Sequence, residues 1–140
     1  MIELRRGEYV VCDDPSRLDI TLIHGFLKNS YWAADRTVEV VQRSVDNSLN
    51  FGVYGEGEQV GYARVLTDHA TVAHLSDVFI LEAHRGRGLG RWLVEVVLSH
   101  PDLAGLAWRL TTENAHELYR RYGFEEIERP EKLMERRPLR

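Results

Sequence analysis

The stretch VFILEAHRGRGLGRWLVEVVL, from Val78 to Leu98, decides the fold. It begins with a continuous apolar run and passes through a turn that holds three glycines and three arginines. It then continues with apolar residues at Leu89, Trp92, Leu93, Val96 and Val97. This i, i+3, i+4, i+7, i+8 spacing predicts an amphipathic helix. The stretch is therefore expected to be a strand, a glycine-rich loop and a helix in immediate succession.

The glycine-rich loop is typical of a phosphate site. The first N–H groups of a helix have no partner within the helix, and the helix dipole makes that end positive. Glycines let an anion approach the backbone closely, and Arg85, Arg87 and Arg91 add positive charge. A nucleotide P-loop requires a lysine that this loop lacks, and a dinucleotide-binding loop requires glycine where Arg91 stands. The pattern that fits is R-x-x-G-x-G, at Arg85, Gly88 and Gly90.

The rest of the chain surrounds this unit with further strands and helices. Periodicity and turn residues predict helices at 15–30, 36–48, 89–100 and 114–124, and strands at 8–14, 49–57, 59–68, 72–81, 106–112, 124–128 and 132–137. Asn114 is expected to cap the last helix, with Glu117 three residues later. The order predicts an α/β protein with a mixed sheet and helices on its faces, in a single domain that spans residues 1–140.

Composition narrows the functional classes. A chain of 140 residues with a formal net charge of −4 argues against general nucleic-acid binding, which usually requires a basic excess. Cys12 is the only cysteine, so it has no disulfide partner within the chain. We find no signal peptide and no apolar run long enough for a membrane span, and the histidines show no metal-binding spacing. We expect a cytoplasmic protein that uses no membrane, nucleic acid or metal.

Four segments together carry a resemblance to a known family: the strand SDVFIL, the loop RGRGLG, the strand WRLTT and the ending AHELYRRYGF. The chain resembles the GCN5-related N-acetyltransferases (GNAT) over essentially its whole length. The family's A-x-x-x-Y-x-x-x-G-F pattern is matched by Ala115, Tyr119, Gly123 and Phe124. The resemblance implies a GNAT-type mixed sheet flanked by helices. It also implies acetyl-CoA as co-substrate and direct transfer of the acetyl group to an amine.

The resemblance also assigns residues to CoA. It implies that the loop backbone binds the pyrophosphate, through Arg85, Gly86, Arg87, Gly88, Leu89, Gly90 and Arg91. The three arginine side chains either add affinity or face solvent. The backbone of Val78, Phe79 and Ile80, on a strand that parts from its neighbour at a bulge, is expected to pair with the pantetheine arm. Many members carry an asparagine seven residues before the tyrosine. Thr112 stands there in this chain, so either Thr112 or Asn114 is expected to contact pantetheine, unless Asn114 is only a helix cap.

Three residues are the catalytic candidates. Tyr119 matches the position that protonates the departing thiolate, and a phenol that stays protonated at pH 7 suits this role; the alternative is a core tyrosine. His74 matches one position of the general base, and Asp77 matches an acidic position near the acceptor; a water chain is the other possibility. Strand alternation places His74 and Asp77 on opposite faces unless a bulge intervenes.

The acceptor is the open question. We expect the primary amine of a small molecule, such as a polyamine or an amino acid. The alternatives are a protein lysine or N-terminus, or a CoA-binding sensor domain without activity. The loop that holds Tyr31 and Trp32 is expected either to line the acceptor pocket or to cover the core. A homodimer is compatible with all of these interpretations.

Overall fold

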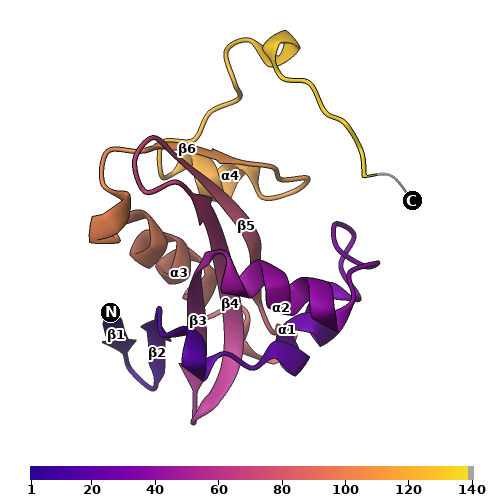
Figure 1. Ribbon diagram of the computed structural model, residues 1–140. Helices are drawn as coiled ribbons and strands as arrows, with labels where there is room; N and C mark the ends of the chain where they lie inside the picture. The colour runs from indigo at the N-terminus through magenta and orange to yellow at the C-terminus, as the bar shows by residue number, and fades with distance from the viewer. Residues whose placement is uncertain (139–140) are drawn as a thin grey trace.

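A six-stranded sheet in the order β1-β2-β3-β4-β5-β6 is the centre of the computed structural model, which describes residues 1–138 (Figure 1). Strands β1 to β5 pair antiparallel, whereas β5 and β6 run parallel. The strands are β1 (Glu3–Arg6), β2 (Tyr9–Cys12), β3 (Leu49–Gly55), β4 (Glu58–Thr67), β5 (Val72–Ile80) and β6 (Ala107–Leu110). The predicted mixed sheet is therefore confirmed.

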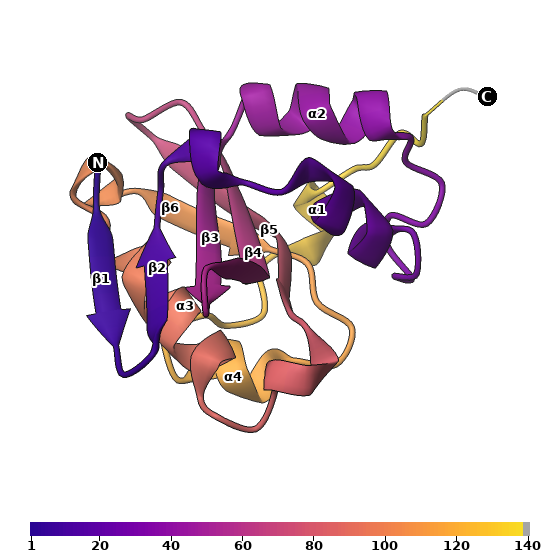
Figure 2. The ribbon, with the colours of Figure 1, turned by 90° about the horizontal axis from the view of Figure 1, so that it is seen from below.

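Within the described residues, four α-helices cover the two faces of this sheet, on the sides that Figure 2 shows. Helices α1 (Ile20–Leu27) and α2 (Val38–Asp46) lie on one face and pack with Tyr62 and Phe79. Helices α3 (Leu89–Leu98) and α4 (His116–Arg120) lie on the other face, over the larger apolar core. The amphipathic stripe of α3 is buried as its spacing predicts, so α3 is fixed tightly against the sheet.

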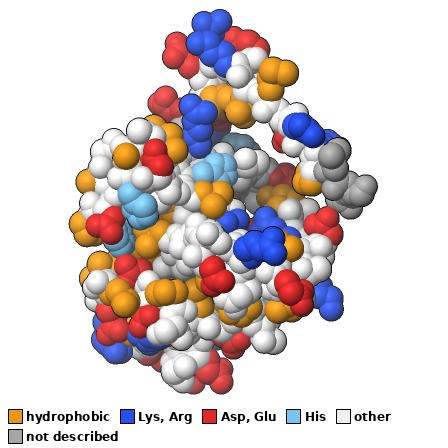
Figure 3. Space-filling view, viewed as in Figure 1, with side chains coloured by type: hydrophobic (Ala, Val, Ile, Leu, Met, Phe, Trp, Pro, Cys, Tyr) orange, Lys and Arg blue, Asp and Glu red, His pale blue; other side chains and the backbone are white. Residues whose placement is uncertain are grey.

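The two ends of the chain differ from the sequence prediction. Strand β1 was not predicted, because all of its residues are exposed and it has no apolar face to signal it. The predicted strands at 124–128 and 132–137 are wrong, since that segment forms only a short 3₁₀ turn at Pro130–Lys132. Proline cannot donate to a strand ladder, and residues 125–138 are exposed. The segment arches away from the body of the molecule (Figure 3).

A β-bulge in β5 changes which side chains share a face. Gly61 pairs with Ile80 and Tyr62 with Phe79, but Arg64 pairs with Ser76, so one residue of β4 stands opposite two of β5. Asp77 adopts a positive φ of 52° at this point, a conformation that is uncommon outside glycine. Ser76 and Asp77 consequently both contact Arg64, on the face of the sheet that α1 and α2 cover.

Candidate active site

The candidate site is the cleft that opens where β5 and β6 part. Their pairing runs from Val72 and Ala107 to Leu75 and Leu110, where β6 ends while β5 continues to Ile80. A cavity of about 820 Å³ lies along the stretch of β5 that β6 leaves unpaired. Val78, Phe79 and Ile80 all line it. The parting of the strands that was expected at these three residues is present, together with its bulge.

The glycine-rich loop forms one end of this cavity. Gly86 and Gly88 have φ values of 79° and 77°, which L-amino acids with side chains rarely adopt. Gly88 is the N-cap of α3, and its carbonyl oxygen accepts the first helical hydrogen bond from the N–H of Trp92. The amides of the first turn of α3 therefore have no partner within the helix, and Leu89 and Gly90 line the cavity. An anion at this point is stabilised by these amides and by the helix dipole.

The three loop arginines differ in their contacts. Arg85 lines the cavity, and its Nε donates to the carbonyl oxygen of Ile80 at 2.9 Å. Arg87 turns toward β2, where its Nη1 donates to the hydroxyl of Tyr9 at 2.6 Å. Neither Arg87 nor Arg91 is among the cavity-lining residues that the structure describes. Arg87 therefore fixes the loop to the sheet, and Arg85 is the loop arginine whose side chain borders the cavity.

Tyr119 reaches the cavity from α4 on the opposite wall. Its side chain is only 9% exposed and packs edge-on against Phe124. Burial raises the pKa of the Tyr119 hydroxyl above its ordinary value, and the nearby Tyr31 raises it further. The phenol therefore keeps its proton at neutral pH, which is the state that a general acid requires.

His74 and Asp77 both line the cavity but have different surroundings. Burial lowers the pKa of the His74 imidazole, and the positive charge of Arg64 lowers it further, so the ring is neutral near pH 7. Within residues 1–138, no hydrogen bond to the ring of His74 is found. The alternation of β5 sets His74 on the face of Ser76, and the bulge brings Asp77 to that same face.

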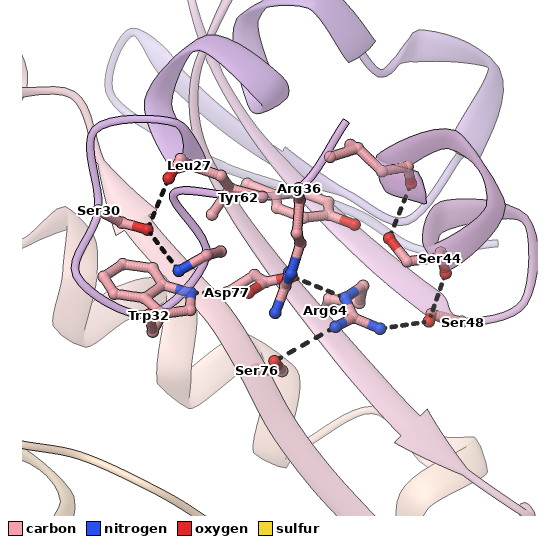
Figure 4. Close-up of polar contacts among 12 residues, drawn as sticks. Leu27, Ser30, Trp32, Arg36, Ser44, Ser48, Tyr62, Arg64, Ser76 and Asp77 are labelled. Atoms are coloured by element: carbon pink, nitrogen blue, oxygen red, sulfur yellow. Dashed lines mark hydrogen bonds and ion pairs between the residues drawn. The ribbon is translucent and has the colours of Figure 1, made fainter. Parts of the chain in front are cut away.

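Asp77 is the centre of a buried polar network (Figure 4). Its Oδ2 accepts from Arg36 Nη1 and from Arg64 Nε, each at 2.8 Å, and its Oδ1 accepts from Trp32 Nε1 at 2.8 Å. Burial alone would raise the pKa of Asp77, but the two guanidinium groups outweigh it and hold the pKa below its ordinary value. Asp77 is thus a carboxylate at neutral pH with both oxygens engaged.

Thr112 and Asn114 line the cavity on the turn between β6 and α4. The hydroxyl oxygen of Thr112 accepts from the N–H of Ala115 at 3.0 Å, and this bond shapes the turn. Ala115 is the N-cap of α4, and no side chain caps the helix, so the prediction that Asn114 would be its cap is wrong. Thr112 instead stabilises the turn that precedes α4.

Sequence reasoning missed two arginines of the site. Arg36 lies between α1 and α2, and Arg64 lies on β4, yet both converge on Asp77. Their separations from Asp77 in the chain are 41 and 13 residues, so no local pattern connects them. Only the bulge in β5, which the sequence does not mark with a glycine, turns Asp77 toward them. Among the described residues, no group of three or more His, Cys, Asp or Glu side chains is arranged to hold a metal ion.

A strand, a glycine-rich loop and a helix in succession, beside two parting parallel strands, define an acyl-CoA-type transferase fold. Comparison with known proteins agrees, because the acetyltransferase (GNAT) domain model matches residues 46–126. The chain belongs to the GNAT family. A candidate GNAT acetyltransferase from Xanthomonas campestris pv. campestris, solved by crystallography, is 48% identical, with 93% of each chain covered and a TM-score of 0.90.

Two further relatives extend the comparison. A candidate acetyltransferase from Gibberella zeae is 32% identical over 112 residues, which is 66% of this chain. The match spans 63% of the length of that relative. A Mycobacterium tuberculosis protein crystallised in complex with CoA shares the fold at 21% identity and a TM-score of 0.67, with 84% of this chain and 72% of that chain covered. In the part of the chain that the structure describes, no helix is long and apolar enough to span a membrane.

Proposed function

We propose that this protein is an acetyl-CoA-dependent N-acetyltransferase that acetylates the primary amine of a small molecule. The observation that carries the proposal is that one cavity joins three elements. These are the glycine loop at the start of α3, the unpaired stretch of β5 and the side chain of Tyr119. Membership of the GNAT family supports the same conclusion.

The backbone is proposed to hold the donor. The amides from Gly86 to Arg91 are suited to a pyrophosphate, because two left-handed glycines and the first turn of α3 gather N–H groups at one end of the cavity. The backbone of Val78 to Ile80 offers hydrogen-bonding groups to an extended amide-containing arm, as an added strand would. Thr112 and Asn114 line the same cavity as this strand and are proposed to contact the same arm.

The side chains are proposed to move the protons. The thioester supplies an activated acetyl group, and attack by a neutral amine forms the C–N bond as the C–S bond breaks. Neutral His74 accepts the proton that the ammonium must lose, directly or through water, because its lowered pKa keeps it unprotonated near pH 7. Tyr119 gives its proton to the departing sulfur, and the proton that the nitrogen releases as the amide forms returns through water to the Tyr119 phenolate. Asp77 is the weaker candidate for the base, since its oxygens already accept three hydrogen bonds.

Cys12 is not proposed to carry the acetyl group. Its thiol is buried on β2, where Sγ accepts from the N–H of Asp14 and from Arg17 Nη1, each at 3.5 Å. It is not among the described residues that line the cavity. A Cys12→Ala variant is expected to keep its turnover, and a folded but inactive variant would contradict direct transfer.

The test is release of free CoA from acetyl-CoA by the purified protein, followed with a thiol reagent, in the presence of a panel of primary amines. Amine-dependent release with formation of the N-acetyl product supports the proposal. Binding of acetyl-CoA without release for any amine would instead favour a non-catalytic CoA-binding domain. A cytoplasmic location, a single domain and a homodimer stay predictions from the sequence.

A further inference from the structure

The wall of the cavity contributed by α1 and the segment after it is aromatic. Phe26 stacks on Phe79, with ring centroids 3.9 Å apart and planes 9° apart. Tyr31 meets Trp32 edge-on at 5.1 Å, and all four rings line the cavity. Tyr31 is 63% exposed and Trp32 is 38% exposed, so both rings keep free surface for a ligand. Exposed aromatic rings bordering a cavity are typical of a binding surface for flat apolar groups.

This aromatic wall is held in place by polar contacts beneath it. The indole N–H of Trp32 donates to Asp77 at 2.8 Å. The hydroxyl of Ser30 donates to the carbonyl oxygen of Leu27 at 2.7 Å and accepts from the N–H of Ala33 at 3.1 Å (Figure 4). Ser30 and Trp32, the residues before and after Tyr31 in the chain, are therefore both held by hydrogen bonds. A wall that is already ordered loses little conformational entropy when a ligand packs on it.

The charge beside the wall does not suit a polycation. Asp77 is the one buried carboxylate among the described cavity residues, and it faces two guanidinium groups, those of Arg36 and Arg64. Two positive charges against one negative charge leave no net attraction for a second ammonium group. Glu113 also lines the cavity, but its side chain is exposed, and an exposed carboxylate attracts a cation weakly through water.

Tyr31 also lines the same cavity as Tyr119, the proposed general acid. A substituent packed on Tyr31 would therefore share that cavity with the phenol of Tyr119. The aromatic wall is thus placed to contact the acceptor, because it borders the cavity in which the transfer is proposed to occur.

We infer that the acceptor is a primary amine that carries an aromatic or similarly flat apolar substituent, with Tyr31 as the residue that selects it, and that polyamines are poor acceptors. This inference rests on the proposed function, and it names the substrate class of that same site.

The test compares 2-phenylethylamine with 1,4-diaminobutane as acceptors for the wild type, Tyr31→Ala and Tyr31→Phe. For the wild type, kcat/KM is expected to be about tenfold higher for 2-phenylethylamine, because its ring buries apolar surface on Tyr31 and Trp32. The ratio of the two kcat/KM values should approach one in Tyr31→Ala. It should return in Tyr31→Phe, which keeps the ring and loses only the hydroxyl.

Calorimetric titration of the CoA-bound protein with each amine separates the two proposals. Preferred turnover of 2-phenylethylamine that is lost in Tyr31→Ala supports both. Preferred turnover of 1,4-diaminobutane, or a ratio that Tyr31→Ala leaves unchanged, overturns the inference and leaves the acetyltransferase proposal standing. Tyr31-dependent binding of 2-phenylethylamine without turnover supports the inference and contradicts the acetyltransferase. Absence of both turnover and binding overturns the inference.

Discussion

The proposed donor end and the proposed acceptor end of the cavity are built from different parts of the chain. The donor end, the loop Arg85–Gly90 with the first turn of α3, presents backbone amides that left-handed glycines orient. The acceptor end, made of Phe26, Tyr31, Trp32 and Asp77, presents side chains held by contacts between distant segments. A backbone site depends on conformation and tolerates most side-chain changes, whereas a side-chain site depends on each group. Substitutions at the two ends should therefore fail in different ways.

The largest effect is expected from Asp77→Ala at the acceptor end. The substitution leaves Arg36 and Arg64 without their shared carboxylate, so the free energy of unfolding should fall by about 3 kcal/mol. The melting temperature should fall by about 10 °C. Because the pKa of Asp77 is lowered in the folded state, the stabilisation is present above the ordinary pKa of about 3.9 and is lost as pH falls through the lowered value. Thermal melts from pH 3 to pH 7 measure this.

Asp13→Ala is the matched control for that change. Asp13 is also buried, accepts from the N–H of Ile2 at 2.8 Å, and pairs with His100 Nε2 at 2.9 Å, outside the cavity. The Asp13→Ala variant should be less stable than the wild type, but the KM of its folded fraction for the amine should be unchanged. Asp77→Ala, in contrast, should raise that KM. An equal change of KM in both variants would contradict a specific role of Asp77 in acceptor binding.

Tyr119→Phe tests the proposed general acid, whose side chain lines the same cavity as both ends. Loss of the phenolic proton should lower kcat by about 100-fold, because a positioned general acid contributes at least that much. The Kd for CoA should change little. Tyr122→Phe is the control, since that hydroxyl donates to Glu95 on α3 and the residue is not among the described cavity residues. Steady-state kinetics at saturating acetyl-CoA measure kcat, and equal turnover in wild type and Tyr119→Phe would exclude the acid role.

His74→Gln tests the proposed base. In the wild type, kcat should fall as pH decreases, with a midpoint below the ordinary histidine pKa of about 6.5, because the folded-state pKa is lowered and only the neutral ring accepts a proton. In the variant, kcat should no longer fall at low pH in this way. At pH 7, kcat of the variant should be about tenfold lower than that of the wild type, since water takes over part of the role of the base. A pH profile that is unchanged in the variant would assign the base to another group.

Gly88→Ala gives the smallest effect and tests the donor end. An added Cβ meets no atom within 4 Å, so only the left-handed φ of 77° opposes it, at about 1 kcal/mol. The Kd for CoA should rise as well, because the methyl group stands where an anion would approach the backbone. Gly57→Ala, at a φ of 81° in the turn between β3 and β4, carries the same strain away from the cavity. Equal Kd values for CoA in both alanine variants would contradict a backbone phosphate site at Gly88.

The sequence predicted the local conformation of the proposed donor end well and the side-chain contacts of the proposed acceptor end poorly, for a physical reason. The strand, the loop glycines and the stripe of α3 lie within 21 consecutive residues, so periodicity and glycine placement define them locally. The contacts among Trp32, Arg64 and Asp77 join three separate segments and require the bulge in β5, which only the assembled sheet creates. Strand alternation alone therefore predicts that His74 and Asp77 lie on opposite faces of the sheet, and only the bulge brings them to the same face.

The chain termini show the same limit. Periodicity predicted strands at 124–128 and 132–137, but a strand requires a partner edge and a face to bury, and residues 125–138 have neither in the structure. Strand β1 is the reverse case: its exposed residues show no strand pattern, yet its backbone pairs with β2 from Glu3 to Arg6. Whether a segment forms a strand depends here on pairing with a neighbouring strand, which β1 has and residues 125–138 do not, and sequence patterns describe such pairing only indirectly.

Amide hydrogen exchange with and without CoA tests the central claim most directly, because the claim concerns the backbone. CoA should slow exchange in peptides that cover residues 78–80 and 86–91, where the unpaired stretch of β5 and the first turn of α3 leave amides free for a ligand. Unchanged exchange in both segments at saturating CoA would contradict the account. Protection confined to another part of the molecule, such as the cavity of about 350 Å³ beside Gln42 and Asp46 of α2, would contradict it as well.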